Sequence, residues 1–318
     1  IGVAILLYAR QTGNDGWLLR AGESVELRAE TAAEAAQRPA LSPKLSTPPG
    51  TRLRSRRRLA MTAETQRRDL DGLGVAVTGA AGDLGCAMAV ELAGRGAHVT
   101  MLDRVAEAEA SERVAAVSAA GSCSYRQVDV TDRAAVDAAL AAVEPLDVAI
   151  GNAGIVEAAP FLDVSQAQWQ AHLDINVTGC FNVGQAAARV MVERGTPGQI
   201  IFTGSWVGDI PWPEISAYSV SKAGVRMLAR SMARELAERR IRVIVVAPGI
   251  VMAGMARRQY ETDPDYARRA SVVIPLGEFG TAEQVAKATA FLCSPDADYM
   301  TGSVLLVDGG ASLFRFAE

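Results

Sequence analysis

Residues 73–85 read Leu73-Gly74-Val75-Ala76-Val77-Thr78-Gly79-Ala80-Ala81-Gly82-Asp83-Leu84-Gly85. The apolar start predicts a buried strand, and the glycines that follow predict a tight turn into a helix. Glycines in such a turn let the backbone approach a pyrophosphate, while the helix N-terminus supplies N–H groups and the positive end of its dipole. Gly79, Gly82 and Gly85, with Asp83 and Leu84 between the last two, therefore predict a dinucleotide site.

The next apolar stretch, residues 97–102, predicts a second strand, and it ends at Asp103. An acid at this place strengthens the interpretation of the glycine-rich turn. Asp103 is expected to accept hydrogen bonds from the ribose hydroxyls of NAD and to repel the extra phosphate of NADP. Its neighbour Arg104 offers a positive charge to that phosphate. The sequence therefore favours NAD and keeps NADP as the less favoured cofactor.

Beyond residue 103, predicted helices and apolar strands continue to alternate. A third strand is expected to reach Asp129 and Val130, and a long helix to begin near Ser165 and carry Asn176. Further strands are expected at residues 148–150, 199–204, 241–247 and 303–307, with a final helix from Thr281. This alternation predicts an α/β fold, a doubly wound parallel sheet (Rossmann fold) with helices on both faces, in a single domain at residues 66–318.

The stretch from Ser205 to Lys222 holds the candidate catalytic groups. Tyr218 and Lys222 are four residues apart and share one face of a predicted helix. A cation beside a tyrosine favours the phenolate and makes the phenol usable as an acid or base nearer neutral pH. Ser205 follows an apolar strand, where its hydroxyl can hold a carbonyl or alcohol oxygen. Such a Tyr/Lys spacing is ordinary in helices, so the pair alone is suggestive and not decisive.

Composition narrows the class of partner. The formal net charge of −4 argues against a general affinity for nucleic acid or anionic membranes. The four cysteines form no CxxC pair, and the two histidines leave little for metal ligation, so no metal is expected. No apolar run approaches the roughly eighteen residues needed to span a bilayer. We therefore expect a cytoplasmic protein with a small-molecule partner.

Residues 1–65 differ in composition from the rest of the chain. They contain an Ala/Glu-rich stretch, a Pro/Ser-rich segment and the basic run Arg52–Arg58. Such composition is typical of linkers and disordered segments. We predict a disordered or non-native extension, with Met61 as the physiological start.

The motifs taken together resemble the short-chain dehydrogenase/reductase family, in its single-domain branch, over about residues 68–312. The resemblance rests on Thr78-Gly79-…-Gly85, Asp129-Val130, Asn152-Ala153-Gly154, Asn176, Ser205, Tyr218-…-Lys222, Pro248-Gly249 and Val307-Asp308-Gly309-Gly310. It implies an oxidoreductase that interconverts a secondary alcohol and a ketone, and a homotetramer or homodimer built on the helices that carry Asn176 and Tyr218.

The resemblance also implies roles for single residues. Tyr218 resembles the acid/base that exchanges a proton with the substrate oxygen, and Lys222 the residue that lowers the phenol's pKa and binds the nicotinamide ribose. Ser205 is similar to the hydroxyl that orients the substrate oxygen. Asn176 resembles the residue whose backbone helps to hold a water in a proton relay.

Other matched residues resemble cofactor contacts. Asp129 and Val130 are similar to the adenine-pocket pair. Asn152, with Ala153 and Gly154 in the same motif, is similar to the residue near the adenine ribose that ties the central strands. Pro248, Gly249 and the residues as far as Val251 are similar to the segment beside the nicotinamide amide.

Four positions depart from this pattern, and two of them, Gly151 and Ile244, stand where asparagine is common. Asp83 stands where the single-domain branch usually has glycine, and the resulting glycine spacing is closer to the extended branch of sugar-nucleotide epimerases. Asp83 is also suited to be the N-cap of the helix. Ala253 stands where a threonine often contacts the cofactor, and its methyl side chain cannot make that hydrogen bond.

Alternative functions and the substrate stay open at this point. A nucleotide-sugar epimerase or dehydratase is disfavoured because fewer than a hundred residues follow Lys222, and a non-catalytic dinucleotide-binding scaffold would not need the full catalytic set. Cyclic alcohols, hydroxysteroids, polyols and 3-oxoacyl thioesters are candidate substrates. Residues 252–275 are expected to form a mobile lid, and Trp206 and Trp212 are equally suited to the pocket and to the core.

Overall fold

The computed structural model describes residues 68–313, without the side chains of Met255, Arg258 and Ser271. Within these residues, seven parallel strands form one sheet in the order β3-β2-β1-β4-β5-β6-β7. The strands are β1 (Gly74–Thr78), β2 (His98–Asp103), β3 (Cys123–Gln127), β4 (Val148–Gly151), β5 (Gly198–Thr203), β6 (Ile241–Pro248) and β7 (Val304–Val307). This sheet confirms the predicted fold. The prediction for residues 1–65 lies outside the described residues.

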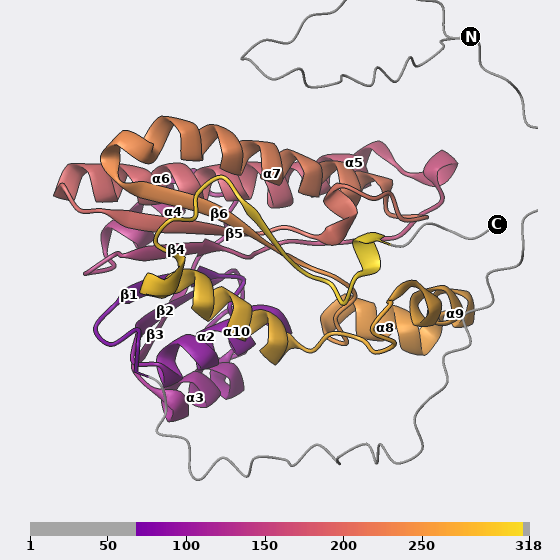
Figure 1. The fold of residues 1–318 in the computed structure, drawn as a ribbon, viewed down its shortest axis with the longest axis horizontal. Helices are drawn as coiled ribbons and strands as arrows, with labels where there is room; N and C mark the ends of the chain where they lie inside the picture. Colours follow the sequence, from indigo (N-terminus) through magenta and orange to yellow (C-terminus); the bar gives the residue numbers. More distant parts are fainter. Residues whose placement is uncertain (1–67, 314–318) are drawn as a thin grey trace, which may run out of the picture. The chain divides into compact units, whose positions relative to one another are not determined.

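Helices cover both faces of the sheet (Figure 1). One face carries α4 (Arg133–Ala141), α6 (Gly179–Arg194) and α7 (Ser216–Leu236). The other carries α2 (Asp83–Gly94), α3 (Ser111–Ala120) and α10 (Ala282–Cys293). Each face has its own apolar core, because the strands are apolar on both sides. Phe202, Met88 and Met101 are completely buried there, and each such side chain contributes roughly 1.5–3 kcal/mol to folding.

The strand order reverses between β1 and β4. From β1 the chain builds outward through β2 to β3, and it then returns to the other side of β1 for β4 and the strands that follow. In open α/β sheets, the crevice at the carboxyl ends of the strands beside such a reversal is where ligands bind. The fold therefore directs attention to the segments that follow β1 and β4.

Two expected elements differ in detail from the structure. Strand β3 ends at Gln127, short of Asp129, because the Asp129 carboxylate accepts hydrogen bonds from the Thr131 N–H (2.8 Å) and hydroxyl (2.7 Å) and closes a turn. The expected long helix has three parts: α5 (Gln166–His172), a π-helical segment η2 (Leu173–Thr178), and α6. Asn176 lies in the π-helical part.

The expected lid at residues 252–275 contains two helices, α8 (Gly254–Thr262) and α9 (Pro264–Val273). Asp263 caps α9 by accepting the N–H groups of Asp265 and Tyr266, and Pro264 supplies a pre-set first turn. The α9 face packs into a third apolar cluster, which contains Trp206, Val207, Trp212, Ile250, Tyr266, Ala270, Val273, Ile274 and Ala311. Among the described residues, no helix combines the length and the apolar character needed to cross a membrane.

Candidate active site

A cavity of about 790 Å³ opens at the carboxyl ends of the strands, on both sides of the β1–β4 reversal. Its volume lies in the range usual for cofactor and small-molecule sites. Every residue that the sequence predicted for cofactor contact lines this cavity. Ser205, Tyr218 and Lys222 line it as well, and Asn176 lies behind its wall. Residues from opposite halves of the chain are therefore brought to one site.

The glycine-rich turn is tightly packed at two of its three glycines. A Cβ at Gly85 would lie 2.2 Å from the Gly79 carbonyl oxygen, and one at Gly79, where φ is +64°, would lie 2.8 Å from Ala153 Cα. Helix α2 begins at once, so the N–H groups of its first turn have no partner within the helix. The residues thus fit a dinucleotide pyrophosphate, because the turn is compact and presents free donors to the cavity.

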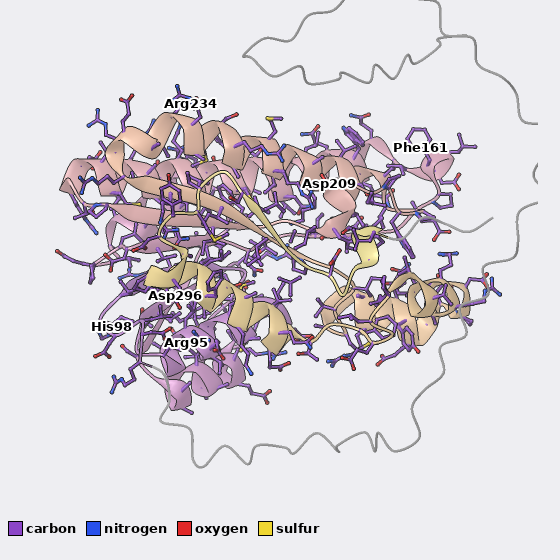
Figure 2. The ribbon with its side chains drawn as sticks, viewed as in Figure 1. Arg95, His98, Phe161, Asp209, Arg234 and Asp296 are labelled. Carbon is purple, nitrogen blue, oxygen red and sulfur yellow. The ribbon has the colours of Figure 1, made fainter. Side chains whose placement is uncertain are left out.

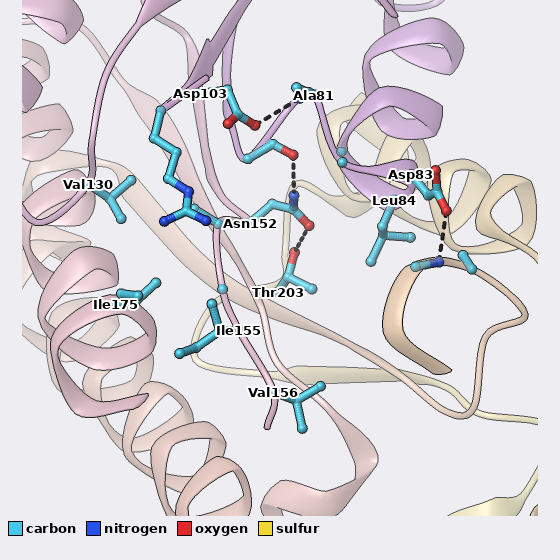
Figure 3. A pocket seen from close by; sticks show the side chains of 18 of the residues that line it. Ala81, Asp83, Leu84, Asp103, Val130, Asn152, Ile155, Val156, Ile175 and Thr203 are labelled. Atoms are coloured by element: carbon cyan, nitrogen blue, oxygen red, sulfur yellow. Dashed lines mark hydrogen bonds between the residues drawn. The ribbon is translucent and has the colours of Figure 1, made fainter. Parts of the chain in front are cut away.

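Asp83 is the first residue of α2, and Gly82 is its N-cap. The interpretation of Asp83 as the N-cap is therefore wrong, since the N-cap is the preceding residue. The Asp83 carboxylate does not cap its own helix but binds donors from other segments. One oxygen accepts the Gly254 N–H at 2.7 Å (Figure 3). The other oxygen accepts from the Arg113 guanidinium at 2.5 Å. These donors, with the Gly254 N–H as the largest influence, hold the pKa of Asp83 below its ordinary value.

The acidic residue at the end of β2 faces the cavity beside the turn. Asp103 accepts the Ala81 N–H at 2.9 Å and the Val105 N–H at 3.3 Å (Figure 3). Arg104, Asp129 and Val130 line the same end of the cavity. The Thr131 N–H is the main cause of the lowered pKa of Asp129. This end of the cavity therefore carries two carboxylates, Asp103 and Asp129, and one guanidinium, Arg104, that could contact the ribose of a dinucleotide.

Asn152 links the three central strands. Its side-chain amide donates to the carbonyl groups of Thr78 (3.0 Å) and Gly79 (3.3 Å), and its amide oxygen accepts from the Thr203 hydroxyl at 3.1 Å (Figure 3). The Thr78 hydroxyl in turn accepts the N–H groups of Asn152 and Ala153. The glycine-rich turn is thereby fixed to β4 and β5, which lead to the candidate catalytic residues.

Tyr218 and Lys222 lie one turn apart in the first part of α7, as their spacing predicted. The Lys222 ammonium lies 5.5 Å from the centre of the Tyr218 ring and donates to the Thr203 carbonyl at 2.8 Å. Lys222 is only 3% exposed. A buried cation is costly unless it is hydrogen-bonded, so the Thr203 carbonyl fixes where this charge can lie. Ser205 follows β5 and is buried at the same wall of the cavity.

Asn176 is fully buried and ties the wall to α7. Its amide donates to the Ile155 carbonyl (3.0 Å) and the Ser221 hydroxyl (2.9 Å), and its oxygen accepts the Ile155 N–H at 2.8 Å. A Cβ at Gly154 would lie 3.1 Å from the Asn176 oxygen and 3.5 Å from the Lys222 ammonium. Because π-helical segments depart from the regular hydrogen-bond ladder and are frequent at functional sites, η2 suits a relay position.

On the far side of the cavity, β6 ends at Pro248 and the chain runs through Gly249 to Val251. The Gly249 N–H donates to the Val307 carbonyl at 2.9 Å, and a Cβ at Gly249 would lie 2.6 Å from Asp308 Cα. The terminal Asp308-Gly309-Gly310 motif therefore packs against the Pro248-Gly249 segment. This close approach explains why both motifs carry glycine.

Arg226 is a site residue that the sequence analysis missed. It lies one turn beyond Lys222 in α7, is 4% exposed, and donates to the Ser205 carbonyl at 2.6 Å. Its guanidinium also pairs with Asp209, which Figure 2 shows beside α7. The only sequence signal was the i+4 spacing from Lys222, and nothing in the sequence indicated that Arg226 contacts the residue at position 205.

The two tryptophans do not line the cavity. Trp206 and Trp212 are 4% and 6% exposed and pack edge to face, with ring centres 5.4 Å apart. They belong to the third apolar cluster, against which Tyr218 also packs. Trp206 and Trp212 therefore belong to the core that supports the catalytic wall. Within residues 68–313, no group of three or more His, Cys, Asp and Glu side chains is placed to hold a metal ion.

Comparison with known proteins gives consistent matches. A family described as Enoyl-(Acyl carrier protein) reductase matches residues 79–312. The chain is 38% identical to 3beta-hydroxysteroid dehydrogenase 1 of Eggerthella lenta, over 77% of this chain and 96% of that protein. It is 37% identical to the L-tagatose-forming galactitol 2-dehydrogenase of Cereibacter sphaeroides, over 77% and 97%.

A solved structure of a putative 2-deoxy-d-gluconate 3-dehydrogenase from Agrobacterium tumefaciens, with bound NADP, has a similar fold. Its TM-score is 0.72 at 30% identity, with 78% of this chain and 99% of that chain covered. The family match includes strands β2 to β7 and all the residues that line the cavity.

Proposed function

The chain belongs to the short-chain dehydrogenase/reductase family, and from this premise we propose that it interconverts a neutral, apolar secondary alcohol and its ketone, with Tyr218 as the acid/base. The chain is an NAD(P)-dependent oxidoreductase. The observation that supports the proposed chemistry is the meeting of Ser205, Tyr218 and Lys222 at one wall of the dinucleotide-sized cavity. When bound, a nicotinamide dinucleotide supplies the hydride donor or acceptor.

The proposed roles follow from how these side chains are held. The Ser205 hydroxyl orients the substrate oxygen, and the Tyr218 hydroxyl takes or gives the proton at that oxygen. The Lys222 ammonium, fixed by the Thr203 carbonyl, stabilises negative charge on the Tyr218 oxygen. Asn176 keeps η2 in place beside Lys222, where backbone carbonyl groups can hold a water that connects the ammonium to solvent.

The cavity's charges support the choice of substrate class. The charged residues that line it are Asp83, Asp103, Arg104, Glu109, Glu112, Arg113, Asp129 and Lys222. All except Lys222 lie at the end of β2 or in the segments that follow β1, β2 and β3, where the dinucleotide is expected. The segments that follow β4 and β6 instead contribute the apolar side chains of Ile155, Val156 and Ala256 to the cavity. A polyol needs hydrogen-bond partners for each hydroxyl, and a thioester carrying phosphates needs cations, so a neutral apolar substrate fits these side chains better.

We propose NAD as the preferred cofactor. The Asp103 carboxylate lies at the cavity and is held by two backbone N–H groups, so its charge stays beside the expected ribose. A 2′-phosphate would meet that charge. Arg104 lines the same region and is the residue that would favour NADP.

A substrate panel with both cofactors tests substrate class and cofactor together. We expect reduced dinucleotide to form with cyclohexanol and a 3-hydroxysteroid, and kcat/KM with galactitol or an anionic hydroxy acid to be lower by at least about a hundredfold. NAD should give the higher kcat/KM. A preference for galactitol would overturn the substrate class, and a kcat/KM with NADP equal to or above that with NAD would overturn the role of Asp103.

A variant of Arg226 tests how Ser205 is positioned. Arg226→Met removes the donor to the Ser205 carbonyl, and small misplacements of catalytic groups are costly, so kcat should fall by roughly tenfold to a hundredfold. Dinucleotide affinity should not change, because Arg226 does not line the cavity. The control is Arg230→Met, one turn further along α7 and exposed. Wild-type kcat in Arg226→Met would show that Ser205 is positioned without this contact.

We also propose a cytoplasmic homodimer or homotetramer. The four cysteines are free thiols, which suits a reducing compartment. Exposed apolar side chains lie on the helices expected at the subunit contact, Phe181 on α6 and Val220 and Met227 on α7. Burying them against a second copy would remove this apolar surface from water.

A further inference from the structure

Two of the departures from the family's usual pattern, Asp83 and Ala253, lie at one contact in the structure. Helix α8 begins at Gly254, and its N-cap residue, Ala253, has no side-chain oxygen to cap it. The Gly254 N–H instead donates to the Asp83 carboxylate at 2.7 Å, across 171 residues of sequence (Figure 3). Asp83 therefore supplies from another helix the capping acceptor that Ala253 lacks.

The geometry at Gly254 explains why its N–H can be reached. Its φ is +51°, in the left-handed region that favours glycine, and nothing lies within 4 Å of an added Cβ. The constraint at this position is therefore conformational and not steric. The turn aims the first N–H of α8 at the N-terminus of α2, where Asp83 is the first residue.

Arg113 makes this arrangement compatible with an anionic ligand. Its guanidinium, on α3, donates to the second Asp83 oxygen at 2.5 Å, and both residues line the cavity. A free carboxylate beside the glycine-rich turn would repel a pyrophosphate. The positive charge of Arg113 offsets the negative charge of Asp83. Asp83 can therefore bind the start of α8 without strongly repelling the pyrophosphate.

We propose that Asp83 is a positioning residue that docks the start of α8 onto the glycine-rich turn and so slows the release of the bound dinucleotide. Val251, Ala253 and Gly254 line the cavity directly before or at the start of α8. A dinucleotide in the cavity would lie between the turn and this segment, and separation of α8 from the turn would open a way out for it. The proposal rests on the dinucleotide site of the proposed function, and not on turnover.

The first measurement is hydrogen exchange of the cofactor-free protein. Asp83→Gly removes both contacts, and the backbone amides of residues 254–262 should then exchange faster by about tenfold, the size expected for losing one charge-assisted hydrogen bond. Asp83→Asn keeps an oxygen for the Gly254 N–H and should show a smaller increase. The control is Asp137→Asn, whose ion pair with Arg133 lies within α4 and outside the cavity. Wild-type exchange in Asp83→Gly would overturn the proposal.

The second measurement is the rate at which reduced dinucleotide dissociates, followed by fluorescence after rapid mixing with a competitor. Asp83→Gly should release it faster by about tenfold, with Arg113→Gln in the same direction because it removes the partner of Asp83. If Asp83→Gly does not fold, Asp83→Ala, which also removes both contacts, provides the same comparison. Unchanged release in folded variants would overturn the proposal. Neither readout needs turnover, so a chain that proves inactive would refute the proposed function and leave this test standing.

The pH dependence gives a further check. Because the pKa of Asp83 is lowered in the folded chain, the contact is complete above the ordinary carboxyl range and is lost only as pH falls through the lowered value. The groups near it are Arg113, Arg257 and the buried Cys86 thiol, whose pKa is raised by burial. After correction for the intrinsic rate, exchange at residues 254–262 should therefore be constant between about pH 5 and 8. A corrected exchange rate that increases as the pH is lowered from 8 to 5 would contradict a role of the ionised Asp83 carboxylate in this contact.

Discussion

Tyr218→Phe is expected to lower kcat by about 10³-fold, within the range that positioned proton transfer contributes to enzymes. The substitution removes only the hydroxyl that exchanges a proton with the substrate oxygen. The ring keeps its packing against the apolar cluster that includes Trp206 and Trp212. The loss should therefore fall on kcat, with the protein still folded, and steady-state kinetics under saturating dinucleotide measures it.

Two controls make this prediction specific. Dinucleotide affinity, measured by fluorescence titration, should stay close to that of the wild type. Tyr260 packs against the same cluster but does not itself line the cavity, so Tyr260→Phe should leave kcat unchanged. Full activity of Tyr218→Phe would mean that another group exchanges the proton.

Lys222→Met is expected to lower kcat/KM by at least about a hundredfold, because it removes the positive charge that stabilises the Tyr218 oxygen. Methionine has a similar length and no charge, so the buried space stays filled. The Thr203 carbonyl loses its 2.8 Å donor, and a moderate fall in the melting temperature should accompany the kinetic effect.

The pattern of the loss separates Lys222 from Tyr218. Lys222→Met should weaken dinucleotide binding as well as kcat, since Lys222 lines the cavity and is proposed to bind the ribose. Tyr218→Phe should change kcat alone. Lys287→Met, on α10 and outside the cavity, is the matched control. A kcat/KM for Lys222→Met equal to that of the wild type would contradict the proposed role of its charge.

Much of the site was predictable because it depends on local patterns. Gly79, Gly82 and Gly85 lie between a strand and a helix, and the next strand ends in the acid Asp103, so together they indicate a dinucleotide site. The spacing of Tyr218 and Lys222 works in the same way, since four residues make one turn of a helix. These predicted residues line one cavity in the structure.

Contacts between distant segments were not predictable from one sequence. Nothing in the pattern indicates that Asp83 reaches Gly254, or that Arg226 reaches the Ser205 carbonyl. Such contacts depend on how helices pack across the sheet, which periodicity does not specify. Trp206 shows the same limit, because a buried aromatic residue and a pocket aromatic residue give the same pattern in sequence.

The π-helical segment is a third case. A helix was correctly expected to contain Asn176, yet residues 173–178 depart from α-helical geometry. Asn176 bonds to both backbone groups of Ile155 and to Ser221. These long-range hydrogen bonds fix Asn176 relative to β4 and α7, and the helix accommodates this fixed point by widening locally.

The most direct test of the central claim is product stoichiometry with a neutral apolar alcohol. Purified protein is incubated with NAD and cyclohexanol, the reduced dinucleotide is followed by its absorbance, and the organic product is identified by mass spectrometry. The account predicts cyclohexanone in an amount equal to the reduced dinucleotide, with neither formed by Tyr218→Phe over the same time. A wild-type protein that binds the dinucleotide but forms no ketone from any neutral secondary alcohol, with either cofactor, would contradict it.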